Sequence, residues 1–516
     1  MRNKSILLLL SLFALLSSCR FLEEDPRSQL PKEALSTGDE TLLYLNTLGN
    51  LYTLVGGSEE SQGLMGTYRG VYDLNTFTTD EAIMPTRGGD WYDGGFWQRL
   101  YLHSWEPFEG PFKATWNYLY QVITLANQAI IDLDGHPDLQ AEARGLRALY
   151  YYELLDLFGN VPLVTAPDVP VGEVKQSSRA DVFGFVVSEL EDVLVRLPVQ
   201  PSQQPGSYYG RFTRPVAVFL LAKLWLNEPV YAGRSDWPKV LECCGELTRM
   251  GYRLESQYAS NFSIKNEFSQ ENIFTIPADK IRYSAQFQYL FRSRHYDHAA
   301  ACGFTGENGA SATLEALDAN GFLTRCPDPR FELNYWAGQP FDLDGKPVSL
   351  DTGEPLVYKP LSIALDVTGT PDEKTAGARM RKYELDPNGL KDGKLNDNDI
   401  VLFRYADVLL MEAEAHLRME DREQALACVN AVRARAGARL LESVSLDDIL
   451  RERMVELAWE GWRRQDLVRF GAFTRPYSFR PSLPRELETG YTTLFPIPSD
   501  VLDLNPNLKQ NPGYGD

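Results

Sequence analysis

The sequence predicts a mainly α-helical protein whose helices support a long loop-rich face with short strands. Apolar residues recur at steps of three and four from Trp116 to Ile130, which is the spacing of one buried helix face. The same periodicity returns in the last third of the chain. Residues 56–110 and 252–400 lack it; the first is rich in Gly and aromatic residues, and the second contains repeated turn signals. Irregular segments of this length are usually functional or contain short strands.

Several of the expected helices have recognisable start and stop signals. The helix that follows the 116–130 segment ends at Gly159. Further helices are expected at residues 179–196, 214–227, 237–250, 403–418, 421–436 and 446–470. Asp236 and Ser445 are expected N-caps, because their side chains can accept hydrogen bonds from first-turn amides. Asp421 followed by Gln424 resembles a capping box.

Short connections join the helices into pairs. The turn at residues 419–421 with the following Ala425 resembles part of a tetratricopeptide unit. Such units bury their apolar faces only by stacking on neighbouring units. We therefore expect a tetratricopeptide-like helical-repeat scaffold, and the degenerate repeat signal leaves the number of units open.

The N-terminus has the pattern of an export signal that ends at a cysteine. Basic residues Arg2 and Lys4 precede an apolar stretch at residues 6–16, and small residues stand just before Cys19. This stretch is shorter than the ~20 residues that a membrane-spanning helix needs. We expect cleavage after residue 18 and lipidation of Cys19, which would anchor the chain to a membrane leaflet. The alternative is an ordinary secretory signal followed by a chance cysteine.

The chain is expected to have three parts. Residues 1–18 form the signal peptide, and residues 19–32 form a lipidated flexible tether with acidic and proline residues. Residues 33–516 form a single body, with an N-terminal part at about 33–251 and a loop-rich and C-terminal part at about 252–516.

Charge and composition narrow the classes of partner and cofactor. A net charge of −20 disfavours nucleic acid, since such binding relies on neutralising phosphates. No Cys and His residues have the spacing of a zinc site. Residues 342–345 and 392–399 have calcium-like Asp spacings but lack the terminal glutamate of a calcium loop. We expect no cofactor, with a structural calcium ion as the alternative.

Six motifs occur in order along the chain, at residues 144–151, 158–163, 404–415, 430–437, 460–471 and 495–498. As an ordered set they resemble the SusD/RagB family of Bacteroidota outer-membrane lipoproteins. The resemblance implies tetratricopeptide-like helix pairs that support an irregular ligand face. It also implies a cell-surface protein that covers a SusC-like TonB-dependent porin in the outer membrane and captures a nutrient, usually a glycan. The acidic residues Glu23, Glu24 and Asp25 are similar to the export tag of surface-exposed lipoproteins, so the lipid anchor is expected to face the cell exterior.

The charged residues of these motifs are expected to serve helix packing and carboxylate pairing, since their helix spacings suit such pairs. The arginines are Arg147, Arg404, Arg433 and Arg463, and the carboxylates are Glu412, Glu460 and Asp466. We expect no catalytic residues and no enzymatic activity. A surface glycoside hydrolase is the less favoured alternative, because some pair of the many carboxylates must lie at the ~5–10 Å separation of glycosidases.

Residues 80–105 are the main candidate for a ligand site. Three of the nine tryptophans fall between residues 91 and 105, among glycines that suit a surface loop. Sugar C–H groups pack on aromatic rings, and sugar hydroxyls need planar donors and acceptors. The predicted aromatic platforms are Trp91, Tyr92 and Trp97, and the predicted hydroxyl partners are Arg87, Asp90 and Asp93. The alternative is that Trp97 and Trp105 pack the loop onto the helices.

A second candidate lies at residues 282–298, because the family commonly contributes a second binding loop from the middle of the chain. We favour His295 and Tyr296 there, and Trp336 is a third choice. A peptide or another nutrient is the alternative ligand class, since aromatic loops bind both. A purely structural plug for the porin, without a ligand of its own, is a further alternative.

Overall fold

The computed structural model describes residues 40–57, 61–66, 69–200, 206–281, 292–390 and 395–515. The chain divides into two compact units, residues 1–47 and 48–516. Only residues 40–47 of the first unit are described, and they begin helix α3 (Glu40–Gly56). The signal peptide, Cys19 and the tether lie outside the described residues and stay predictions.

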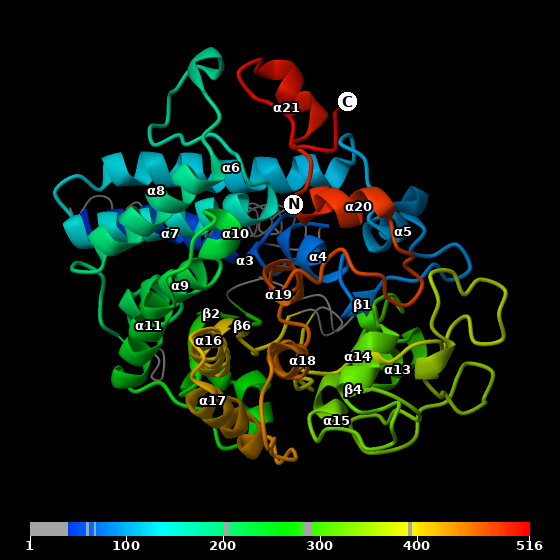
Figure 1. Ribbon diagram of the computed structural model, residues 1–516. Coiled ribbons are helices and arrows are strands. Elements are labelled where there is room, and N and C mark those ends of the chain that lie inside the picture. Colours follow the sequence, from blue (N-terminus) through cyan, green and yellow to red (C-terminus); the bar gives the residue numbers. More distant parts are fainter. Residues whose placement is uncertain are drawn as a thin grey trace, which may run out of the picture. The chain divides into compact units, whose positions relative to one another are not determined.

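Long helices of the second unit form a stack in which each helix packs on the next (Figure 1). The order is α6 (Gly110–Asp132), α7 (Pro137–Leu157), α8 (Arg179–Val193), α9 (Arg214–Leu226), α11 (Trp237–Arg249), α16 (Tyr405–Arg418) and α17 (Arg422–Arg435). Helix α11 packs on α16 although residues 250–404 intervene. One continuous stack therefore joins the N-terminal half to the C-terminal third, and the predicted fold class is confirmed. Within the described residues no helix is long and apolar enough to cross a bilayer.

Side-chain periodicity and caps explain these helices. Helix α6 buries Trp116, Leu119 and Ile123 on the face that the sequence predicts. The predicted caps are present: Asp236 accepts from the amide of Lys239, and Ser445 forms a capping box with Asp448. The Asp421 side chain likewise accepts from the amide of Gln424. Each cap satisfies a first-turn amide that has no partner within its own helix.

The single helix predicted at residues 446–470 is wrong. The structure has two helices, α18 (Leu446–Glu456) and α19 (Arg463–Arg469). Between them Trp459 and Gly461 have φ angles of +64° and +77°, which end a right-handed helix. The Trp459 amide donates to Oε1 of Glu81 over 2.6 Å, so a distant segment fixes the turn. Apolar periodicity continues across this break, and the sequence alone therefore does not reveal it.

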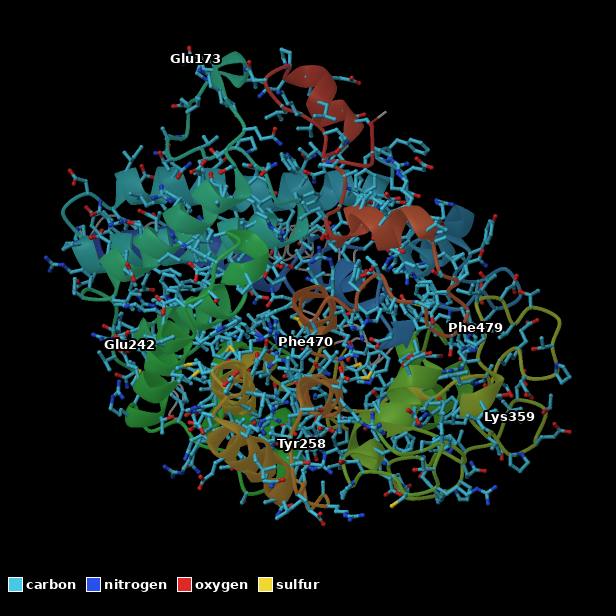
Figure 2. The ribbon with its side chains drawn as sticks, in the orientation of Figure 1. Glu173, Glu242, Tyr258, Lys359, Phe470 and Phe479 are labelled. Carbon is cyan, nitrogen blue, oxygen red and sulfur yellow. The ribbon has the colours of Figure 1, made fainter. Side chains whose placement is uncertain are left out.

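Within the described residues, three antiparallel strand pairs join the irregular segments, and short strands were predicted there. They are β1 (Ala82–Ile83) with β3 (Ser311–Ala312), β2 (Asn272–Ile276) with β6 (Ile400–Arg404), and β4 (Tyr335–Trp336) with β5 (Arg379–Met380). The remaining described α-helices are short. They are α4 (Val71–Thr76), α5 (Phe96–Leu102), α10 (Glu228–Tyr231), α13 (Tyr296–Ala301), α14 (Leu314–Ala319), α15 (Phe331–Asn334), α20 (Pro484–Thr489) and α21 (Ser499–Leu504). Figure 2 shows Lys359 on the loop-rich side and Glu242 of α11 on the helical side.

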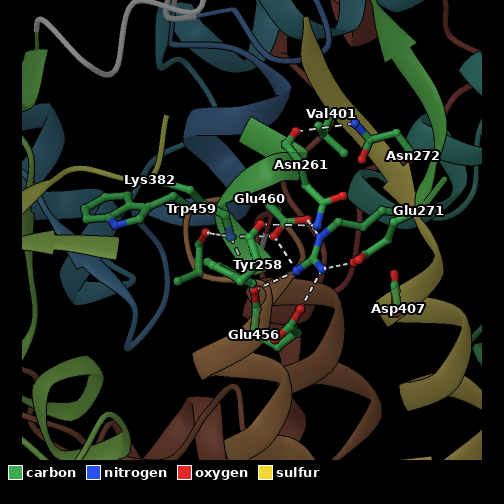
Figure 3. A network of polar contacts seen from close by, with 12 residues as sticks. Tyr258, Asn261, Glu271, Asn272, Lys382, Val401, Asp407, Glu456, Trp459 and Glu460 are labelled. Atoms are coloured by element: carbon green, nitrogen blue, oxygen red, sulfur yellow. Dashed lines mark hydrogen bonds and ion pairs between the residues drawn. The ribbon is translucent and has the colours of Figure 1, made fainter. Parts of the chain in front are cut away.

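A buried ionic network links the strands to α18. The Arg404 guanidinium donates to Glu271, Glu456 and Glu460 over 2.6–2.8 Å, and all four side chains are buried (Figure 3). Lys382 forms a further ion pair with Glu460. Paired charges of this kind offset the large cost of removing each charge from water. The network therefore joins elements that are distant in sequence.

Most other charged residues of the motifs also form ion pairs, but with partners that the sequence did not predict. Arg147 pairs with Glu189, Arg433 with Glu452, and Arg463 with Asp80; Asp466 pairs with both Arg453 and Arg469. Glu412 differs, since its partner among the described residues is the imidazole of His416 at 3.8 Å, one helical turn away. The motif charges thus serve packing between elements, as the sequence predicts.

Candidate functional site

A tight hairpin at residues 87–90 begins the segment that the sequence marks as a ligand site. The backbones of Arg87 and Asp90 exchange two hydrogen bonds of 3.0 Å. Gly88 and Gly89 have φ angles of +58° and +100°, and such turns need glycine because other residues clash there. The amide of Gly88 also donates to Oγ1 of Thr368 over 3.0 Å, which places the hairpin beside residues 366–376.

The backbone directly after the hairpin is strained. Trp91 and Asp93 have φ angles of +61° and +43°, although neither is glycine. Each such conformation costs about 1–3 kcal/mol and persists only where surrounding contacts enforce it. Strain of this kind gathers at ligand-binding loops. We infer that the side chains of residues 90–93 are held in a set arrangement.

Trp91 is half-buried and fixed from several sides. Its Nε1 donates to the Glu307 carbonyl over 2.8 Å, and the Arg292 guanidinium lies 5.5 Å from the ring centroid. A side chain at Gly309 would approach its Cε2 atom to 2.6 Å. The ring is therefore oriented before any ligand arrives. Tyr92 beside it is 51% exposed.

Trp97 is not an exposed platform, which corrects one predicted role. Its side chain is 1% exposed and packs edge-on against Phe77 and Phe96, with ring centroids 5.3 and 5.2 Å away. Its Nε1 donates to Oδ2 of Asp93 over 2.7 Å. Trp105 is buried as well, so the alternative that both residues pack the loop onto the helices is correct.

Arg87 is also buried, at 4% exposure, so the prediction that it binds ligand hydroxyls is wrong. Its guanidinium donates to the carbonyls of Glu373 and Ala376 over 2.7 and 2.8 Å, and to Ser311 over 3.0 Å. Burial and the neighbouring Arg379 lower the pKa of Arg87. Its role is to hold residues 366–376 against the hairpin.

The exposed carboxylates of the loop have defined partners. Asp93 pairs with Arg69, and Asp90 accepts a 2.8 Å hydrogen bond from the Tyr296 hydroxyl. Partial burial opposes ionisation of Asp93, but the hydrogen bonds from Arg69 and Trp97 lower its pKa overall. Tyr296 is 39% exposed, and partial burial followed by the bond to Asp90 raises its pKa to about 12. Asp93 is thus a carboxylate at neutral pH, and Tyr296 is a neutral phenol.

His295 has a structural position. It is 1% exposed and caps helix α13, where its Nδ1 accepts from the amide of Asp297 over 3.1 Å. Burial lowers its pKa to about 4, so the ring is neutral. The predicted ligand contact through His295 is therefore wrong, and its function is to place the adjacent Tyr296 at the start of the helix.

These residues define one surface, which we call the Trp91–Tyr296 face: Asp90, Trp91, Tyr92, Asp93 and Tyr296. It combines half-exposed or exposed rings with acceptor carboxylates. The sequence did not identify Arg69, Glu307 and residues 366–376 as the residues that position these side chains. Nothing in their local sequence indicates this, because their importance comes from contacts across the fold. The 282–291 part of the second candidate lies outside the described residues.

Trp336 lies in a different environment. Its ring contacts Arg381 and His298, and it lines a cleft to which no residue of the Trp91–Tyr296 face contributes. The Asp-rich turn at residues 342–345 satisfies its own backbone, since Asp342 accepts from the amides of Asp344 and Lys346. Across the described parts of the chain, no three His, Cys, Asp or Glu side chains form a group that could hold a metal ion.

Comparison with known proteins places this arrangement in a family. The family model described as "SusD family" matches residues 364–514, and the model "Starch-binding associating with outer membrane" matches residues 21–226. The chain belongs to the SusD family. Both ends of the chain match, which agrees with the continuous helix stack that joins them.

The similar proteins span nearly the whole chain. The starch-binding protein SusD of Bacteroides thetaiotaomicron is 26% identical, over 88% of this chain and 87% of that protein. Surface glycan-binding protein A from Bacteroides uniformis has a TM-score of 0.72 at 21% identity, covering 91% of this chain and 99% of that one. A laminarin-binding SusD-like protein has a TM-score of 0.70 at 24% identity, covering 92% and 99%. These two structures show the SusD fold of the chain.

Proposed function

We propose that this SusD-family protein is a non-catalytic glycan-binding lipoprotein of the outer membrane. In this proposal Cys19 carries the lipid, the body faces the cell exterior, and bound oligosaccharide passes to a SusC-like TonB-dependent porin. Family membership and the names of the relatives support this assignment, since they include a starch-binding, a glycan-binding and a laminarin-binding protein.

The observation that carries the proposal is the Trp91–Tyr296 face. The pre-oriented ring of Trp91 offers an apolar surface for the C–H groups of a sugar, and Tyr92 and Tyr296 extend it. The carboxylates of Asp90 and Asp93 supply acceptors for sugar hydroxyls beside these rings. A rigid site loses little conformational entropy when ligand binds, which favours affinity.

The protonation of this face fits binding rather than hydrolysis. A general acid needs a raised pKa so that it holds a proton near neutral pH. The pKa of Asp93 is lowered instead, and the pKa of Tyr296 is raised to about 12. Neither group exchanges protons readily at pH 7. Asp93 therefore acts as a fixed hydrogen-bond acceptor in our proposal.

Purified protein without its signal peptide should be titrated calorimetrically with starch and laminarin oligosaccharides, other neutral glycans and a peptide panel. We expect saturable binding of at least one glycan, no release of shorter products, and a large loss of affinity in Trp91→Ala. Binding to peptides alone would support the other nutrient class. Product release would favour a hydrolase, and no binding with intact association to the porin would favour a structural plug.

A further inference from the structure

A cleft of about 560 Å³ lies between the end of strand β4, the turn at Tyr258–Phe262, the tip of the 341–347 hairpin and residues 381–385. Its volume falls within the ~300–1,000 Å³ of typical small-molecule sites. The residues that line it include Trp336 and none of the Trp91–Tyr296 face. The cleft is therefore separate from that face.

Two donors at this cleft have no hydrogen-bond acceptor within the described residues. The Arg381 guanidinium is half-buried and lies 4.1 Å from the ring centroid of Trp336, yet it donates no hydrogen bond and forms no ion pair there. Nε1 of Trp336 is fully buried and also lacks an acceptor. The guanidinium nitrogens of Arg381 are open to solvent, so a ligand acceptor can replace water as their partner. Nε1 of Trp336 has no exposed surface and does not contribute to that contact.

Acceptors and an apolar surface line the same cleft. One carboxylate oxygen of Asp342 accepts two backbone amides, and one of Glu384 accepts the amide of Ile264. The other oxygen of each carboxylate has no partner in the described parts of the chain. Phe341 is 45% exposed at the rim. Arg381 covers one face of Trp336, and His298 meets that ring at 90°, so Phe341 is the better stacking surface.

We propose that this cleft is a second carbohydrate site, separate from the Trp91–Tyr296 face, that binds a neutral oligosaccharide against Phe341, Arg381 and Glu384. The inference rests on the proposed function for its ligand class. Sugar hydroxyls both donate and accept, which matches the mixture of donors and carboxylates. Lys382 is paired with Glu460, and the carboxylates of Asp342 and Glu384 together outweigh the charge of Arg381, so the lining does not favour an anionic sugar.

The test is calorimetric stoichiometry with the full chain lacking its signal peptide and a neutral hexasaccharide, either maltohexaose or laminarihexaose. We expect two sugar molecules per wild-type chain, with the cleft at least tenfold weaker than the Trp91–Tyr296 face. Trp91→Ala should retain one molecule per chain, bound in the cleft. Phe341→Ala and Arg381→Gln should each lose the weaker site and keep the stronger one.

Controls separate this inference from the proposed function. Phe268→Ala removes an equally bulky ring that is 64% exposed outside the cleft, and it should bind as wild type. Unchanged thermal unfolding midpoints would show that the variants fold. A single site that disappears in Trp91→Ala would overturn the second site while supporting the proposed function. The second site would also be overturned if Phe341→Ala and Arg381→Gln each still bound two sugar molecules per chain. Failure of wild type to bind any neutral oligosaccharide would overturn both.

Discussion

The Tyr296 hydroxyl donates to Oδ2 of Asp90 over 2.8 Å and joins helix α13 to the 87–90 hairpin across 206 positions of sequence. Both residues are exposed, so the bond holds two surface segments together at the place where Trp91 and Tyr92 emerge. The sequence marks these segments as two separate candidates. The contact unites them in one face.

This bond should contribute to ligand affinity by fixing the face. Tyr296→Phe removes the hydroxyl and keeps the ring, and we expect a loss of about 0.5–1.5 kcal/mol in binding free energy. Asp90→Ala should cost a similar amount. The double variant should lose less than the sum, because each single change already breaks the bond. Dissociation constants of all four proteins for the same glycan measure this coupling, and additive losses would show that the two residues act independently.

Trp97 should contribute more to the stability of the fold than to ligand binding. Trp97→Ala removes a fully buried ring, so we expect the free energy of unfolding to fall by about 3–5 kcal/mol. Trp97→Phe should cost less, since most of the volume remains. Urea denaturation measures both changes. A Trp97→Ala variant as stable as wild type that still loses glycan binding would restore the platform role.

Glu456 should make the fold sensitive to acid. Burial alone would raise its pKa, but Arg435, Arg404 and Arg330 hold the pKa below the usual value. Its stabilising effect is therefore complete above the unfolded pKa of about 4.3 and is lost as the pH falls through the lower folded pKa. Glu456→Gln leaves buried arginines unpaired, and we expect a loss of about 3–5 kcal/mol at pH 7. The difference from wild type should narrow below pH 4 in urea titrations; a constant difference would contradict this.

Glu81 should show the opposite pH dependence. Burial is the main cause that raises its pKa to about 7, while its Oε1 accepts from the Trp459 amide. The folded state keeps the proton where the unfolded state has lost it, so this group destabilises the fold as the pH rises from about 4.3 through 7. Glu81→Gln keeps an acceptor and removes the titration. We expect the variant to be more stable than wild type by about 1–3 kcal/mol at pH 8 and nearly equal at pH 4; equal stability at pH 8 would contradict this.

The helices were largely predictable because their signals are local. Apolar periodicity located α8, α9, α11, α16 and α17, and their observed ends lie within three residues of the expected ones. The break between α18 and α19 was not predictable, because the contact between Trp459 and Glu81 that fixes it spans 378 positions. The packing of α11 on α16 is similarly non-local, and the sequence did not indicate it.

The candidate face was predictable in position but not in detail. Glycines and tryptophans marked residues 80–105 as a surface loop. Tyr92 is exposed and Trp91 half-buried there, whereas residues 96–102 form helix α5. Composition could not separate Trp91 from Trp97 or Asp90 from Arg87, because burial depends on contacts with residues 292–311 and 366–376. An arginine beside glycines suggests a ligand contact, yet Arg87 binds backbone carbonyls of a segment nearly 290 positions away.

The most direct test of the account is the glycan affinity of Trp91→Ala, measured calorimetrically beside wild type and Phe108→Ala. Phe108 is 76% exposed and lies outside the Trp91–Tyr296 face, so its variant controls for loss of any surface ring. Truncation of a central aromatic contact typically costs 2 kcal/mol or more, which is about thirtyfold in affinity. We predict a loss of that size in the Trp91–Tyr296 site for Trp91→Ala and wild-type affinity for Phe108→Ala. Wild-type affinity in a correctly folded Trp91→Ala protein would contradict the proposal that Trp91 binds the glycan.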